Sequence, residues 1–159
     1  MEQHREPKPL VEGLGGAFVF SEDVPRLVKW YEERLGIDFE GDRVNAAYAQ
    51  FFARDDSDTE RRLDTTFSIL AAQRPLPEVD REDWDESQMY GDQPFMVNLR
   101  VGDLDVVLER LRHHGTRILG TQDEPYGRFA WIYDADDNRV ELYESRMAAW
   151  MEQNEEDPA

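Results

Sequence analysis

The same order of short elements occurs twice in this sequence. In the first half, a hydrophobic strand-like segment at 17–20 precedes a helical stripe over 23–36 that opens with Asp and closes with Gly. In the second half, an alternating segment at 95–101 precedes a similar stripe over 103–115 with the same two end residues. Asp favours the start of a helix and Gly favours its end, so the spacing predicts two equivalent strand–helix units.

Further strands are expected after each helix. Aromatic and β-branched residues predict strands at 45–54, 65–72, 117–119, 129–133 and 139–143. A charged turn is expected at 55–64, and a second turn at 134–138 consists of residues that accept turn geometry. We therefore interpret each half as a strand, a helix and then three strands.

The repeat divides the chain into a tail, two modules and a connection. Residues 1–13 are polar and show no period, so a mobile tail is expected. The modules cover 14–72 and 94–144 and together form a single domain, 14–144. The acidic stretch 73–93 joins them, and its length suits either a flexible linker or a flap over a site.

The last segment, 145–159, is expected to form a C-terminal helix and a tail. Met147, Trp150 and Met151 would share one face of this helix. Such an apolar face is expected to be buried against the chain's own sheet or against a second copy.

The charge balance excludes several kinds of partner. The 159 residues include 36 acidic and 18 basic side chains, for a net charge of −18, which repels nucleic acid and anionic membranes. The absence of cysteine excludes disulfides and thiolate metal sites. No apolar run is long enough to span a bilayer and the polar start does not resemble a signal peptide, so a cytoplasmic location is expected.

The basic residues are almost all arginine, since Lys8 and Lys29 are the only lysines. Excess carboxylate with little lysine is typical of halophilic adaptation, because the Debye length shrinks to about 3 Å in 1 M salt and self-repulsion is screened. A GC-rich genome that favours arginine, or a cationic ligand or partner, would give a similar composition.

These motifs resemble the vicinal oxygen chelate superfamily, which includes glyoxalase I, bleomycin-resistance proteins, fosfomycin-resistance enzymes and extradiol dioxygenases. The matching positions are Asp23, Trp30, Tyr31, Leu35 and Gly36, then 101–105 and Gly115, then 126–128, 134–138 and 140–142. In the last turn Ala135 and Asp137 replace the proline and glycine that the family typically has. The resemblance implies an α+β fold in which two paired βαβββ modules form a curved mixed sheet around a central cleft.

Metal-using members of this superfamily typically carry a histidine on the first strand of each module and a glutamate on the last strand. The resemblance places Gly16 and Met96 at the histidine positions and Glu141 at the glutamate position. Because only one ligand of three is present, no metal cofactor is expected. A divalent ion held by Glu141 and other oxygens is the alternative.

Strand alternation places other side chains on the same face as these three positions. The residues expected to bind a ligand in the cleft are Phe18, Phe20, Met96, Asn98, Arg100, Arg139 and Tyr143. An arginine could hold a carboxylate or carbonyl while aromatic rings stack on the ligand. Alternatively, Glu141 pairs with Arg100 or Arg139 only to neutralise a buried charge.

The resemblance thus implies a protein that binds a small organic molecule without a metal, similar to bleomycin-resistance proteins, and that forms a homodimer. One alternative is a lyase, isomerase or dioxygenase of the same superfamily, with or without a metal, in which Glu141 is the catalytic base. Another is a dimeric domain that binds no ligand.

Halophilic adaptation predicts that potassium chloride stabilises the protein. Raising KCl from low to molar concentration should raise the melting temperature, by roughly 2–4 °C for each kcal/mol of repulsion that is screened. Thermal unfolding at increasing KCl measures this, with sucrose of equal osmolality as the control for solute exclusion. A melting temperature that does not rise with KCl contradicts the halophilic interpretation.

Overall fold

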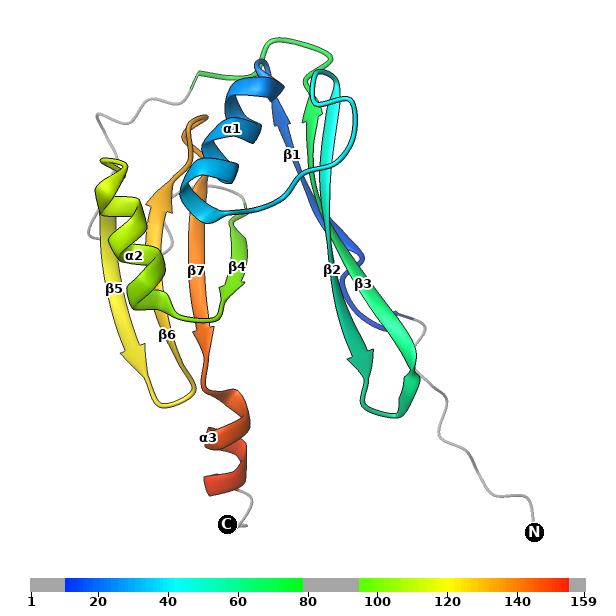
Figure 1. Cartoon of the computed structure of the whole chain (residues 1–159), viewed down its shortest axis with the longest axis vertical. Helices are drawn as coiled ribbons and strands as arrows, with labels where there is room; N and C mark the ends of the chain where they lie inside the picture. The colour runs from blue at the N-terminus through cyan, green and yellow to red at the C-terminus, as the bar shows by residue number, and fades with distance from the viewer. Residues whose placement is uncertain (1–10, 79–94, 155–159) are drawn as a thin grey trace, which may run out of the picture.

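The computed structural model describes residues 11–78 and 95–154 (Figure 1). The elements of the first module are β1 (Gly16–Ser21), α1 (Val24–Leu35), β2 (Ala46–Asp55) and β3 (Asp58–Ala71). Those of the second are β4 (Val97–Val101), α2 (Leu104–His113), β5 (Ile118–Glu124), β6 (Gly127–Tyr133) and β7 (Arg139–Ser145), followed by α3 (Met147–Asn154). Most of the expected tail and most of the expected linker lie outside the described residues.

The two predicted helices and their boundaries are confirmed. The Asp23 carboxylate accepts a hydrogen bond from the Arg26 backbone N–H at 3.1 Å at the start of α1, and Asp103 caps α2 in the same way. Gly36 ends α1 with a φ of 66°, in the left-handed region that glycine adopts at little cost. Helix α2 ends at His113, and Gly115 follows with a φ of 71°.

The strands form two sheets, one in each module, which confirms the α+β fold class. The first has the order β1-β3-β2 and the second the order β4-β7-β6-β5. In each, the first strand of the module runs parallel to the last, and the remaining pairs are antiparallel. Apolar residues of both sheets and of α1 and α2 form one buried core, which includes Val19, Leu27, Tyr31, Phe67, Ile69, Leu104, Leu111, Ile132 and Leu142.

The first module has one strand fewer than expected after its helix. The position of the extra strand is occupied by a single bridge between Glu40 and Tyr48. The backbone then turns away with positive φ at Gly41 and Arg43, while the Asp42 carboxylate accepts hydrogen bonds from three successive backbone N–H groups. These hydrogen bonds lower the pKa of Asp42. They stabilise a turn where a further paired strand was expected.

The charged turn predicted at 55–64 is wrong, because most of that segment is strand. Strands β2 and β3 stay paired up to Asp55 and Asp58, which leaves residues 56 and 57 as the turn. The Asp55 carboxylate accepts from the Ser57 backbone N–H at 2.9 Å and stabilises this tight reversal. Charged side chains are tolerated in the paired strands because they are exposed to solvent.

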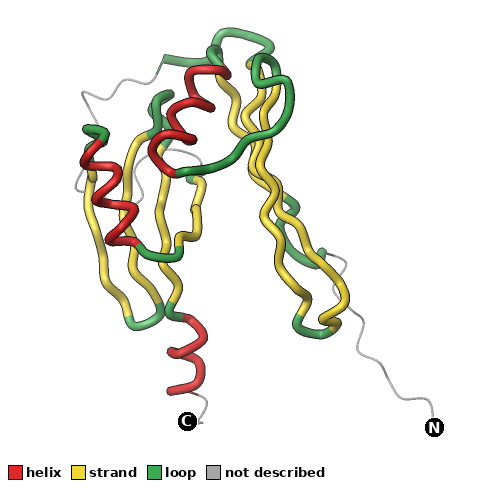
Figure 2. Tube along the Cα trace, in the orientation of Figure 1, coloured by secondary structure: helices red, strands yellow, loops and turns green. Residues whose placement is uncertain are grey.

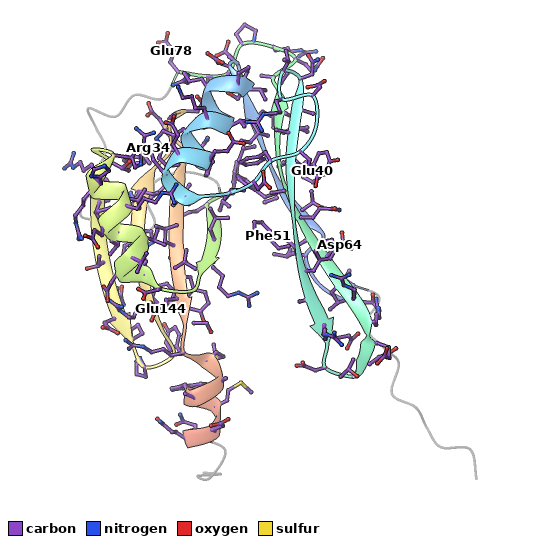
Figure 3. The ribbon with its side chains drawn as sticks, viewed as in Figure 1. Arg34, Glu40, Phe51, Asp64, Glu78 and Glu144 are labelled. Atoms are coloured by element: carbon purple, nitrogen blue, oxygen red, sulfur yellow. The ribbon has the colours of Figure 1, made fainter. Side chains whose placement is uncertain are left out.

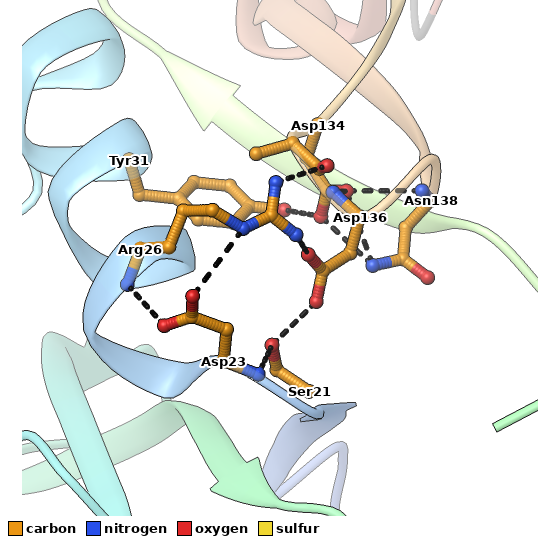
Figure 4. Close-up of polar contacts among 8 residues, drawn as sticks. Ser21, Asp23, Arg26, Tyr31, Asp134, Asp136 and Asn138 are labelled. Carbon is orange, nitrogen blue, oxygen red and sulfur yellow. Dashed lines mark hydrogen bonds and ion pairs between the residues drawn. The ribbon is translucent and has the colours of Figure 1, made fainter. Parts of the chain in front are cut away.

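The turn between β6 and β7 joins the two modules (Figure 4). The Tyr31 hydroxyl of α1 donates to the Asp134 carboxylate at 2.7 Å, and both side chains are buried. Ser21 and Arg26 of the first module bind Asp136 of the same turn. The turn predicted at 134–138 is confirmed, and its contacts fix one module against the other.

The helices form the second part of this junction. The Arg110 guanidinium of α2 donates to the Glu33 backbone carbonyl of α1 at 2.9 Å, and Arg34 donates to the Thr116 hydroxyl at 3.1 Å. Away from the junction the two sheets run apart (Figure 2). No strand of one sheet pairs with a strand of the other within the described segments.

The C-terminal helix α3 forms as expected, but the chain covers little of its apolar face. Trp150 packs edge-on against Tyr126 with ring centroids 6.3 Å apart. Met147 and Met151 stay exposed, so burial against the chain's own sheet is not observed for them. None of the helices in 11–78 and 95–154 has the length and apolar character needed to cross a bilayer.

Replacement of Tyr31 by phenylalanine should destabilise the protein. Burial raises the pKa of both Tyr31 and Asp134, and Y31F leaves the carboxylate without one of its donors. We expect a loss of about 1–3 kcal/mol in the free energy of unfolding, measured by urea denaturation. Y48F is the matched control, because the exposed Tyr48 hydroxyl only reaches Glu40 at 3.3 Å. Equal losses of unfolding free energy in Y31F and Y48F would contradict a stabilising role for the hydrogen bond between Tyr31 and Asp134.

Candidate functional site

Each sheet has one face covered by its helix and one helix-free face, and the sequence-predicted site residues on the strands lie on the helix-free faces. On the second sheet, the register places Asn98 and Trp131 on either side of Glu141. The Asn98 amide donates to one Glu141 carboxylate oxygen at 2.5 Å, and the Trp131 indole N–H donates to the other at 2.8 Å. Glu141 is 8% exposed and Trp131 4%, whereas Asn98 is exposed, so two neutral donors form a cradle for one buried carboxylate beside solvent.

The partners of Glu141 differ from those considered in the sequence. Within the described segments its oxygens accept from an amide and an indole rather than from Arg100 or Arg139. Trp131 was not among the predicted site residues. Its two-residue spacing from Phe129 and Tyr133 on a predicted strand is the signal that would have placed it on the face of Glu141.

An aromatic row crosses the same face beside this cradle. Phe129 and Tyr143 are register partners, and their rings stack with centroids 5.0 Å apart and planes 14° apart. A Cβ atom on Gly127 would lie 2.3 Å from the Tyr143 ring, so glycine there allows the ring to lie across the strand. Arg100 pairs with Tyr143 on the other side and is exposed.

Arg139 lies at the opposite end of the face and is nearly fully buried. Its guanidinium donates to the Tyr133 hydroxyl at 3.3 Å and lies 5.8 Å from the centre of that ring. Met96 is half-buried and directly precedes β4. The second sheet therefore brings six of the eight predicted positions onto one module: Met96, Asn98, Arg100, Arg139, Glu141 and Tyr143.

Phe18 and Phe20 lie on the first sheet and are about half exposed, at 54% and 50%. Val19 between them is buried against α1, so the phenylalanines occupy the helix-free face, with Tyr48 in the same cross-strand row as Phe18. Helix α1 lies on the side of this sheet that is nearer to the second module (Figures 1 and 3). The two helix-free faces therefore do not meet within one chain.

The positions that the resemblance assigns to metal-binding histidines offer no such ligand. A Cβ atom on Gly16 would lie 2.3 Å from the Thr66 backbone oxygen on the neighbouring strand β3. Both oxygens of Glu141 already accept hydrogen bonds. In residues 11–78 and 95–154, no group of three or more histidine, aspartate or glutamate side chains is arranged to hold a metal ion.

A group of ionic contacts lies on the helix-covered side of the second sheet. Arg128 donates to both oxygens of Asp105 at 2.7 and 3.0 Å, and Glu144 lies 3.6 Å away. The hydrogen bond from Arg128 lowers the pKa of Asp105. Because α2 carries Asp105, this pair ties the helix to its sheet and is not part of the candidate site.

Two tandem α+β modules, each with a parallel first-to-last strand pair and a helix-free face, define a class of small two-module proteins. The chain belongs to the Glyoxalase/Bleomycin resistance protein/Dioxygenase superfamily, whose family model matches residues 13–142. This confirms the resemblance stated from the sequence. A search of curated protein sequences gave no significant match.

Solved structures with the same fold include proteins of different activities. A glyoxylase/bleomycin resistance protein/dioxygenase domain from Frankia sp. EAN1pec is 20% identical, with 86% of this chain and 99% of that chain covered and a TM-score of 0.52. The fosfomycin resistance protein FosX from Mesorhizobium loti is 14% identical, with 88% and 98% covered and a TM-score of 0.55. TnmS3, an antibiotic-binding protein from Streptomyces sp. CB03234, is 20% identical, with 86% and 98% covered and a TM-score of 0.54.

Replacement of Asn98 by aspartate tests the cradle around Glu141. N98D removes a donor from a buried carboxylate and puts a second carboxylate beside it, and the repulsion between the two is relieved as the pH falls and one of them is protonated. We expect the free energy of unfolding to fall by about 1–3 kcal/mol at pH 7. This loss should become smaller as the pH falls toward 5, and the melting temperature across this range measures it.

N45D is the matched control for this substitution, because Asn45 donates to Asp42 in an exposed pair. Solvent screens that contact, so its variant should show little pH-dependent loss over the same range. A loss in N98D that is independent of pH would contradict the assigned contact.

Proposed function

We propose that the protein binds a small organic molecule on its helix-free sheet faces and does not use a metal for this. The observation that carries the proposal is the composition of these faces. One presents half-exposed phenylalanines, and the other presents stacked rings beside a buried carboxylate and an exposed arginine. Apolar surface with a few convergent polar groups is typical of small-molecule sites.

The assignment of binding rather than catalysis rests on the surroundings of Glu141. A catalytic base needs a carboxylate oxygen that can approach the substrate's proton. Both oxygens of Glu141 are held by donors, so proton transfer to either would displace a buried hydrogen bond. The residues at the metal positions do not fit a metal ion, since Gly16 has no room for a side chain. The antibiotic-binding relative TnmS3 offers a precedent for binding within this fold.

We propose further that a homodimer completes the site. Phe18 and Phe20 lie on the face of the first sheet opposite α1, and α1 lies on the side nearer to the second module (Figure 1). The half-exposed aromatic rings on this face are in contact with water, which is unfavourable. A two-fold axis would place this face of each chain against the polar and aromatic face of the other and so form two equivalent clefts. The exposed Met147 and Met151 offer additional apolar surface for the same contact.

Binding without turnover is the expected result with antibiotics. Metal-free bleomycin and a set of planar aromatic antibiotics are titrated by calorimetry, and recovered compounds are checked by mass spectrometry. At least one compound should bind stoichiometrically and be recovered unchanged. F18A and Y143A should each weaken its binding by about tenfold, through loss of ring contact.

The matched control is V106A, since Val106 is an exposed apolar residue on α2 and away from both helix-free faces. V106A should bind as the unmodified protein does. Conversion of the compound, or one equivalent of transition metal in protein purified without a chelating tag, would favour the enzyme interpretation instead. Light scattering measures the oligomeric state, and a monomer at micromolar concentration would contradict the proposed homodimer.

A further inference from the structure

The tip of the β2–β3 hairpin brings two arginines together on the helix-free face of the first sheet. Arg54 and Arg62 are direct register partners, and the next pair along the same face is Phe52 with Asp64. Like charges that lie directly opposite each other destabilise a pair of strands. The arrangement therefore carries an electrostatic cost that the fold itself does not require.

Arg54 and Arg62 make other contacts than ion pairs, although Asp64 occupies the next register position on the same face. Arg54 donates to the Thr59 backbone oxygen at 3.1 Å, and the Arg62 guanidinium lies 4.7 Å from the centre of the Phe52 ring. Neither makes an ion pair with a carboxylate in the part of the chain that the structure describes.

Arg61, the neighbour of Arg62, points to the other face of the hairpin and behaves differently. It binds Glu12 at 2.5 Å and lies 3.4 Å from Asp55. Arg26, Arg43 and Arg128 also form ion pairs with carboxylates, whereas Arg100 and Arg110 form none in the described residues. What distinguishes Arg54 and Arg62 is that they lie directly opposite each other.

An open pocket lies at the same place, with a volume of about 420 Å³. Its lining consists of Phe52, Ala53, Arg54 and Arg62, all from one hairpin. The pocket combines the guanidinium groups of Arg54 and Arg62 with the aromatic ring of Phe52.

We propose that this pocket binds the carboxylate of an aromatic acid. The guanidinium groups of Arg54 and Arg62 offer planar N–H donors that match a carboxylate, and the anion removes the repulsion between them. The ligand ring lies against Phe52, where it shares the apolar surface beside Arg62. The net negative charge of the protein repels anions. The attraction for the carboxylate therefore comes from Arg54 and Arg62 themselves, which act at short range.

This inference does not rest on the proposed function. All four lining residues belong to β2 and β3, so the pocket requires neither the second module nor a second chain. Loss of antibiotic binding in F18A concerns the helix-free faces near the junction, whereas the pocket is tested through Arg54 and Arg62 alone.

The test is an NMR titration of the full chain with three probes. Benzoate carries both ring and carboxylate, benzamide carries the ring without the charge, and inorganic phosphate carries charge without a ring. Benzoate is expected to shift the side-chain signals of Arg54, Arg62 and Phe52 in a saturable way. Benzamide and phosphate should bind at least about tenfold more weakly, since each lacks one of the two recognised groups.

Three variants localise the binding. R54Q and R62Q should each weaken benzoate binding by about tenfold, through loss of one charged donor. R61Q is the matched control, because it removes one charge from the same hairpin on the opposite face, and it should bind benzoate within about twofold of the unmodified protein.

Other results overturn the proposal. Absence of saturable benzoate binding, or undiminished binding by R54Q and R62Q, removes the site. Phosphate that binds as tightly as benzoate overturns the assignment to an aromatic acid. A change of molar mass in R54Q or R62Q by light scattering would show that a second copy of the chain, rather than a ligand, contacts these arginines.

Discussion

The arrangement of the two modules depends on the hydrogen bond between the Tyr31 hydroxyl and the buried Asp134 carboxylate. This carboxylate accepts the Tyr31 hydroxyl from the first module and, from its own turn, the backbone N–H groups of Asp136 and Asn138. A buried carboxylate without such donors would cost several kcal/mol, so the turn and the helix stabilise each other. This contact, with α1 against α2, sets how the two sheets are oriented.

That orientation decides how the two helix-free faces lie within one chain. Because α1 covers the side of the first sheet that is nearer to the second module, each helix-free face is formed within its own module. The second module presents Glu141 with its two donors and the stacked pair of Phe129 and Tyr143. The first module presents Phe18 without a partner in the described segments of the same chain. The two faces could therefore contact each other only between two copies of the chain.

Local signals in the sequence predicted the fold well because they act over a few residues. Asp23 and Gly36 mark a helix through their own backbone hydrogen bonds, and these need no tertiary context. The β2–β3 hairpin was predicted too short, since charge along 55–64 indicated a turn while cross-strand pairing governs the chain there. The partners of Glu141 depended on register between three strands, which no single segment of sequence contains, and Trp131 was missed for that reason.

Glycine at position 16 has an evolutionary consequence. The backbone oxygen of Thr66 occupies the space of any Cβ atom there, so a single codon change cannot introduce an imidazole without separating two adjacent strands. Descendants of this chain would have to alter the β1–β3 ladder before gaining a ligand at that point. Substitutions on the exposed aromatic surfaces, by contrast, change side chains without disturbing the main chain.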